Sequence, residues 1–374
     1  MVVPDGVFDG GSVQIQSGRI TSVQKTTENA RNAEALDLSG LTLFPGFIDV
    51  HIHGAVGVDV MDADVEGLVE IAKFLGRNGV TSWLPTFVPA SDGEYAHAIS
   101  VISRAQEMKT SGVRILGVHY EGPFVNTAQC GALHQEYFKT YSSPDDLNSL
   151  VVPPASAKMI TLAPEVNGGI ELVSQLTKRG WVVSIGHTRA TFELLNQAHS
   201  AGAKHMTHFM NAMAPLHHRS PGPIGWGMSR DDVTCDIIAD GVHLNPEILK
   251  LLMKVKGSRG LSLISDSIAA VGKGDGEYQI WGETIAVREG RTSNSAGSIA
   301  GSVITMLDAV KMMRSLGASD VEVAQMASTN PARLLRVNDR CGSIEVGKSA
   351  DLVAIDESGQ VRLTIVAGKV VCQA

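Results

Sequence analysis

The chain has 374 residues, a net charge of −8, and an ordinary balance of 44% hydrophobic and 19% charged residues. A chain of this length buries enough apolar surface to fold without disulfides, and an acidic balance disfavours a nucleic-acid partner. It contains no run of about 18 apolar residues, the minimum for a membrane span, and its four cysteines are scattered. We therefore expect a cytoplasmic protein with reduced thiols and neither a nucleic-acid nor a membrane partner.

Both ends of the chain carry strand patterns. Residues 12–24 alternate around a Ser-Gly turn, as a β-hairpin does, and residues 350–371 repeat the pattern. Short β segments at opposite ends of a chain often pack together. We predict a small β-sandwich domain formed by residues 1–44 and 341–374.

The middle of the chain, residues 45–340, alternates between β-rich runs and helical segments. Such alternation favours βα units and a parallel sheet. The candidate strands are residues 41–53, 81–88, 114–122, 158–165, 181–188, 204–211, 233–241 and 260–267. Eight units predict an α/β fold of the (β/α)8 TIM-like barrel type, with a doubly wound open sheet as the alternative.

Residues that bind metals or titrate stand at the ends of most of these strands, where a barrel gathers its chemistry. Histidine and carboxylate together suit zinc or iron. His51 and His53 share one face of a strand because side chains two residues apart point the same way. His119 reads equally well as a packing residue, and Glu165 as a simple strand end. The full set is His51, His53, His119, Glu121, Glu165, His187, His208, His243 and Asp266.

Residues 342–349, GSIEVGKS, match the phosphate-binding pattern G-x4-G-K-[ST]. A phosphate-binding loop of that kind follows a strand and precedes a helix. Here a polar turn precedes the motif and a strand pattern follows it. We interpret the segment as a tight turn that returns the chain to the small β domain.

Longer motifs resemble those of a known family. PGFIDVHIHG is similar to the opening strand of the amidohydrolase superfamily. HYEGPF, GHT, THFMNAM, ADGVH and SDSIAA then follow in the order of the N-acetylglucosamine-6-phosphate deacetylase family, over essentially the whole chain. The resemblance implies one or two divalent metal ions per subunit, drawn from Zn, Fe, Mn and Co. Glu121, His187 and His208 would hold the main ion, and His51 and His53 a second one.

The same resemblance implies the hydrolysis of N-acetyl-D-glucosamine 6-phosphate to glucosamine 6-phosphate and acetate, with Asp266 as the catalytic carboxylate. Arg219 resembles the phosphate-binding arginine of the family, which can come from a neighbouring subunit, so a homodimer is implied. His243 would contact either the acetamide carbonyl or the phosphate. The substrate-binding positions carried over are Ala132, Leu133, Asn211, Ala212, Arg219, His243, Ile299, Ala300 and Gly301.

One departure keeps other substrates open. Family members commonly read G-A-H or G-A-Q where this chain reads Gly131, Ala132, Leu133 and then His134. Either Leu133 removes a polar contact or His134 replaces it through a shifted loop. The alternatives are N-acetylgalactosamine 6-phosphate, another amide such as a cyclic one, or a non-catalytic scaffold that has kept the barrel.

Overall fold

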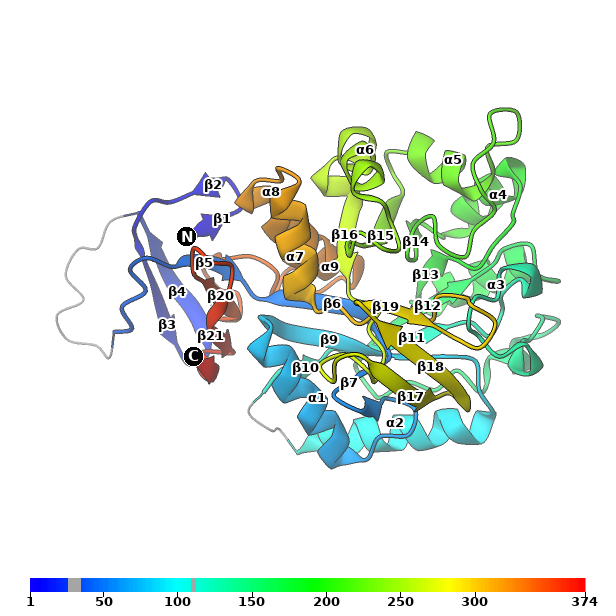
Figure 1. The fold of residues 1–374 in the computed structure, drawn as a ribbon, viewed down its shortest axis with the longest axis horizontal. Coiled ribbons are helices and arrows are strands. Elements are labelled where there is room, and N and C mark those ends of the chain that lie inside the picture. Colours follow the sequence, from blue (N-terminus) through cyan, green and yellow to red (C-terminus); the bar gives the residue numbers. More distant parts are fainter. Residues whose placement is uncertain (26–34, 109–111, 374) are drawn as a thin grey trace.

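The computed structural model describes residues 1–25, 35–108 and 112–373. Its main sheet has nine parallel strands, and eight of them form the barrel in the order of the sequence, with helices between them (Figure 1). The ninth, β10 (Arg114–Ile115), is a short strand that pairs with β9. Each predicted strand overlaps one of these eight, so the barrel prediction is confirmed and the open-sheet alternative is wrong. The strands are β6 (Phe47–Ile52), β9 (Val80–Phe87), β11 (Gly117–Glu121), β12 (Ala157–Leu162), β13 (Val182–Ile185), β14 (His205–Met206), β15 (Thr234–Ile238) and β16 (Leu261–Ile264).

Main-chain hydrogen bonds join the first and last strands of the barrel. The amide of Asp266 donates to the carbonyl of His51 at 2.9 Å, and the amide of His53 donates to the carbonyl of Ser267 at 2.8 Å. Ile52 and Ser267 form a parallel bridge between them. The barrel is therefore drawn closed at the carboxyl ends of β6 and β16, beside the predicted site residues.

Six of the nine described helices start with a side-chain cap. Asp64 accepts a hydrogen bond from the amide of Gly67 at the start of α1, and Ser91 and Glu94 form a capping box at the start of α2. No helix among the described residues is long and apolar enough to cross a membrane. The helices are α1 (Val65–Arg77), α2 (Asp92–Glu107), α3 (Gly169–Lys178), α4 (Phe192–Ala201), α5 (Gly222–Ser229), α6 (Pro246–Lys256), α7 (Met306–Ser315), α8 (Asp320–Ala324) and α9 (Asn330–Leu334).

A buried polar layer crosses the barrel interior. The ring of His119 lies with Nδ1 2.9 Å from the carbonyl of Val50 and Nε2 2.8 Å from the hydroxyl of Thr161. That hydroxyl continues to Thr207 at 2.7 Å, and Thr207 to Ser184 at 2.5 Å. His119 is therefore a packing residue, and both of its ring nitrogens have hydrogen-bond partners.

The two ends of the chain share a second, antiparallel sheet (Figure 1). β5 (Thr42–Pro45) pairs with β20 (Leu352–Ile355), which is followed by β21 (Val361–Val366) and β22 (Lys369–Gln373). The hairpin of β3 (Ser12–Gln16) and β4 (Arg19–Gln24) lies against this sheet, where Ile20, Leu43 and Leu352 are buried in one cluster.

The predicted pairing of both chain ends is confirmed, whereas the domain boundaries stay a prediction, and residues 26–34 of the predicted domain lie outside the described residues. The predicted strand 41–53 needs correction, because Gly46 divides it into β5 and β6. A Cβ atom on Gly46 would lie 2.2 Å from the side chain of Thr81, so the chain packs closely against β9 there.

A three-stranded antiparallel sheet is inserted after β16, and the sequence patterns did not predict it. Its strands are β17 (Gly276–Ile280), β18 (Glu283–Arg288) and β19 (Arg291–Ser293).

The segment 342–349 is not followed by a helix. The ammonium group of Lys348 donates to the carboxylate of Glu345 and to the hydroxyl of Ser343, each at 2.6 Å. The interpretation of that segment as a turn is confirmed.

Gly117→Ala tests the close contact between β11 and β12. A Cβ atom on Gly117 would lie 1.8 Å from the carbonyl oxygen of Ala157, which is backbone and cannot rotate away. We expect the free energy of unfolding to fall by about 1–3 kcal/mol, as for other overpacked sites. Urea denaturation measures it. Gly112→Ala is the control, because nothing lies within 4 Å of its Cβ position. Equal stability of the two variants would contradict this packing.

Candidate metal centre and active site

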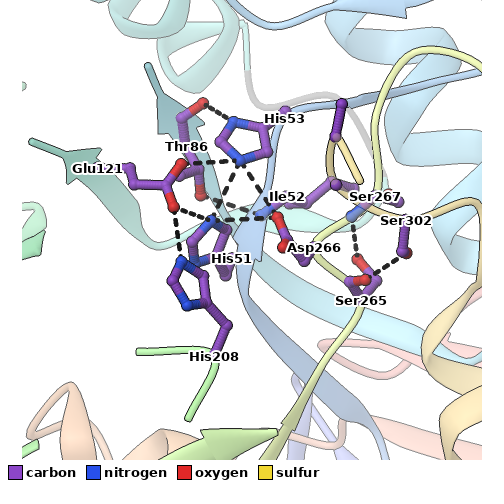
Figure 2. Close-up of polar contacts among 12 residues, drawn as sticks. His51, Ile52, His53, Thr86, Glu121, His208, Ser265, Asp266, Ser267 and Ser302 are labelled. Carbon is purple, nitrogen blue, oxygen red and sulfur yellow. Dashed lines mark hydrogen bonds and ion pairs between the residues drawn. The ribbon is translucent and has the colours of Figure 1, made fainter. Parts of the chain in front are cut away.

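Six side chains from the carboxyl end of the barrel converge on one buried point. They come from β6, β11 and the segments that follow β13, β14 and β16. Figure 2 shows five of them, with Glu121 facing His51, His53 and His208, and Asp266 on the other side of the histidine pair. The six are His51, His53, Glu121, His187, His208 and Asp266.

Glu121, His187 and His208 form the first group. Oε1 of Glu121 lies 2.9 Å from Nε2 of each histidine, and the two Nε2 atoms lie 3.1 Å apart. One carboxylate oxygen and two imidazole nitrogens thus meet within the reach of a single ion.

His51, His53 and Asp266 form the second group. Oδ1 of Asp266 lies 3.3 Å from Nε2 of each histidine, and those two nitrogens lie 3.1 Å apart. Oε2 of Glu121 lies 3.3 Å from Nε2 of His53, so the Glu121 carboxylate joins the two groups. All six residues were predicted from the sequence to lie at the carboxyl end of the barrel, and the structure brings them together.

Hydrogen bonds on the far side of two rings favour a cation between them. Nδ1 of His187 lies 2.7 Å from the carbonyl of Gln129, and Nδ1 of His53 lies 3.1 Å from the carbonyl of Thr86. Since a carbonyl only accepts, each Nδ1 carries the proton. In a neutral ring Nε2 then directs a lone pair at the oxygens of Glu121 or Asp266. Lone pairs that face one another require a cation, so the donor set fits a divalent metal.

The charges of the site lead to the same conclusion. Burial by itself would lower the pKa of His53, but Asp266 and Glu121 outweigh burial and raise that pKa to about 10. Burial acts to raise the pKa of Glu121, yet His51 and the other histidines around it hold that pKa well below its usual range. Burial is likewise outweighed at Asp266, whose pKa is lowered. Both carboxylates are anionic at neutral pH, and their field favours positive charge between them.

Three of these residues have strained backbones. The φ angles of His187, His208 and Asp266 are 49°, 30° and 50°, in the left-handed region that non-glycine residues rarely adopt. Such conformations cost about 1–3 kcal/mol each and persist where the surrounding structure enforces them. The strain aims the three side chains inward from turns that lie just beyond the ends of their strands.

The predicted substrate loops meet beside the six residues. The segment 129–134 reaches His187 through the carbonyl of Gln129, and its Leu133 is buried in the main core. The segment 299–301 adjoins Asp266, since the next amide, of Ser302, donates to the Asp266 carbonyl at 2.7 Å. Ala132 packs against the cluster that contains the β17–β18 hairpin and Ala300.

The other predicted substrate residues differ in how close they lie to the six central side chains. Asn211 donates to the carbonyl of His208 at 3.2 Å, and the carbonyl of Ala212 accepts from Thr188, so both steady the loops that carry the histidines. His243 lies with Nδ1 2.6 Å from Oδ2 of Asp240. Arg219 is exposed, and its described side-chain contact is with His218, at 2.6 Å. Within the described residues, no hydrogen bond or ion pair links Arg219 to the six central side chains.

Two residues beside the site have contacts that the sequence did not predict. Glu165 accepts hydrogen bonds from Asn126, from the hydroxyl of Thr188 and from the amide of Arg189, so it organises the turn after His187 rather than merely ending a strand. The indole of Trp281, in the β17–β18 turn, stands edge-on to the ring of His53, with centroids 5.2 Å apart. A glutamate after a strand is a weak signal, and Trp281 stands in no motif.

The fold and this set of side chains define a class of protein. A model described as the amidohydrolase family matches residues 42–371, which is most of the chain. The chain belongs to the amidohydrolase family, and it is a hydrolase of amides.

Within that family the similar proteins are sugar-phosphate deacetylases. The chain is 38% identical to N-acetylglucosamine-6-phosphate deacetylase of Bacillus subtilis, over 99% of this chain and 95% of that protein. It is 32% identical to N-acetylgalactosamine-6-phosphate deacetylase of Escherichia coli O157:H7, over 99% and 97% of the two chains.

Solved structures agree over the whole length. The crystal structure of N-acetylglucosamine-6-phosphate deacetylase from Thermotoga maritima superposes with a TM-score of 0.90 at 37% identity and covers 100% of this chain and 98% of that one. A variant of the enzyme from Mycobacterium smegmatis, in complex with N-acetyl-D-glucosamine 6-phosphate, has a TM-score of 0.88 at 30% identity, covering 97% and 95%.

Glu121→Gln tests the bridging carboxylate. The change keeps the shape of the side chain but removes the negative charge that faces the histidines. We expect the purified variant to lose most of its bound metal, measured by elemental analysis. Glu171→Gln, the same change at an exposed position of α3, is the matched control. Full metal content in the Glu121 variant would contradict the bridging role.

Proposed function

We propose that this chain hydrolyses the acetamide of N-acetyl-D-glucosamine 6-phosphate to glucosamine 6-phosphate and acetate. One observation carries the proposal: Asp266, an anionic carboxylate, lies 3.3 Å from two histidines, beside a glutamate that faces two more. That arrangement occurs in a chain similar over its whole length to enzymes named for this reaction.

We propose that one or two divalent ions, from Zn, Fe, Mn and Co, belong to the site. Glu121, His187 and His208 would hold the first, and His51 and His53, with Asp266, a second. Such an ion, when bound, lowers the pKa of water from about 16 toward 7 and polarises a carbonyl. The buried surroundings of all six ligands strengthen these electrostatic effects.

Asp266 performs the proton transfers. Its carboxylate takes a proton from the attacking water at Oδ and delivers that proton to the departing amine nitrogen, which is a poor leaving group until it is protonated. A lowered pKa keeps Asp266 ready to accept the proton at neutral pH. The amide of Ser302 and the carbonyl of His51 fix its main chain, so the carboxylate keeps its direction.

Substrate recognition involves two basic residues. His243 presents Nε2 to an oxygen of the substrate, because Asp240 engages its Nδ1 at 2.6 Å. The exposed Arg219 offers a planar guanidinium suited to phosphate, and we propose that it contributes to the active site of a neighbouring subunit in a homodimer.

We also propose a cytoplasmic location, because the four cysteines are free.

A second candidate is the deacetylation of N-acetylgalactosamine 6-phosphate. A relative of that name is 32% identical, within the range of 32–38% found for the glucosamine enzymes, and Leu133 stands where a polar residue is expected. Acetate release from the two epimeric phosphates distinguishes these substrates, and release from neither would favour a scaffold without catalysis.

Asp266→Asn tests the proton transfer. We expect kcat to fall by at least about 10²-fold, the contribution of general acid–base catalysis, while the ion held by Glu121, His187 and His208 remains. Acetate release and elemental analysis measure the two quantities. Asp62→Asn, an identical change on the surface, is the control. Normal turnover by the Asp266 variant would refute the assigned role.

Arg219→Ala tests phosphate recognition and the dimer together. We expect KM to rise far more for the phosphorylated sugar than for N-acetylglucosamine without phosphate, because only the former needs the guanidinium. Mixing the Arg219→Ala and Asp266→Asn chains should restore part of the activity if Arg219 acts across the interface, since one site then has both residues. Equal KM changes would remove the phosphate assignment, and no recovery on mixing would place Arg219 in its own subunit's site.

A further inference from the structure

An open cleft of about 510 Å³ lies between the terminal β-sheet and the start of β10 (Arg114–Ile115), the short strand that precedes β11. It is therefore at the amino ends of the barrel strands, whereas the candidate active site is at the carboxyl ends. Four basic side chains line it: Arg19, Arg114, Arg340 and Lys369. In a chain with a net charge of −8, this concentration of positive charge calls for an explanation.

One wall of the cleft is rigid. It consists of the β3–β4 turn at Ser17–Gly18 and the β21–β22 turn at Ala367–Gly368, each with two successive residues at positive φ. Such turns match the twist of the paired strands. A Cβ on Gly18 would lie 2.7 Å from the Ala367 carbonyl, and one on Gly368 would lie 3.0 Å from the Cα of Gly18, so the turns pack backbone against backbone.

Arg114 is held in place at the base of the cleft. Its guanidinium contacts the buried carboxylate of Asp351 and lies 3.1 Å from the hydroxyl of Ser349. Asp351 also accepts hydrogen bonds from that hydroxyl at 2.9 Å and from the amide of Ala367 at 2.8 Å, so its oxygens are committed. Nε of Arg114 is buried and has no partner among the described residues.

The other three cations have no close carboxylate that would neutralise them. Arg19 donates to a carbonyl, that of Gly347 at 2.7 Å, and the nearest carboxylate to Arg340 is Asp339 at 3.9 Å. No ion pair of Lys369 occurs within the described residues. The cleft thus has four cationic side chains. Of the carboxylates beside them, Asp351 is already hydrogen-bonded and Asp339 is 3.9 Å from Arg340, so the cleft carries net positive charge.

We propose that this cleft binds a phosphate-bearing small molecule, at a site distinct from the candidate active site. Guanidinium groups present paired donors that match phosphate oxygens, and three of the four cations are arginines. The cleft is within the usual range of small-ligand sites, about 300–1,000 Å³. The inference does not depend on the proposed function, because neither the groups nor the space belong to the catalytic end of the barrel.

Calorimetric titration of the metal-loaded protein with inorganic phosphate tests the proposal. The titration is done on the Arg219→Ala variant, which lacks the other expected phosphate contact. We expect one phosphate to bind per chain, and the further pair Arg340→Gln and Lys369→Gln to weaken its affinity at least about tenfold, since charge-assisted hydrogen bonds are lost. Acetate release by the cleft pair in an otherwise unchanged chain should stay at the level of the parent protein.

Lys178→Gln with Arg179→Gln is the matched control, because it removes one lysine and one arginine at the exposed end of α3, outside the cleft. We expect this pair to leave the affinity for phosphate unchanged. An equal loss in both pairs would mean that net charge alone attracts phosphate, and the proposal would be overturned. Unchanged affinity for phosphate in the cleft pair would overturn the proposal as well. So would the absence of phosphate binding to the Arg219→Ala variant before the cleft pair is introduced. Lys369→Gln alone, at an exposed position, serves if the double variant unfolds.

Discussion

The closure of the barrel between residues 51–53 and residues 266–267 is the constraint on which the site depends. Amide and carbonyl groups of those two segments bond to each other, so His51 and Asp266 are neighbours although 214 residues separate them in the chain. Glu121 then reaches both histidine groups from the opposite wall. A change that opened this seam would separate the Asp266 carboxylate from the two histidines that face it, even if every side chain were kept.

Much of the barrel was predictable because its signals are local. Eight strands could be found from alternation with helices, and the six central residues because parallel strands end at one edge. The partners that orient His53 and His187 could not be found, since they are the main-chain carbonyls of Thr86 and Gln129, which any residue has. Gly46, where one predicted strand becomes two, was equally hidden, because only its contact with a neighbouring strand shows why the chain divides there.

The burial of Leu133 alters the question raised by the departure from the family motif. A leucine packed in the main core changes the shape behind the loop and offers no polar contact to a substrate. His134 lies 3.9 Å from Glu283 of the β17–β18 hairpin, and its Nε2 is buried without a hydrogen-bond partner. The polar group of this loop therefore lies beside the inserted hairpin, which periodicity did not predict.

The same hairpin places Trp281 against His53, and this contact has a spectroscopic consequence. The emission of an indole responds to charge on a ring beside it. Among the described residues, the other three tryptophans, Trp83, Trp181 and Trp226, are buried and make no ring contact with the six central side chains. A proton or an ion arriving at His53 alters the field at Trp281 directly. The protein thus carries its own fluorophore at the second histidine group, and the occupancy of that group can be followed in solution without adding a label.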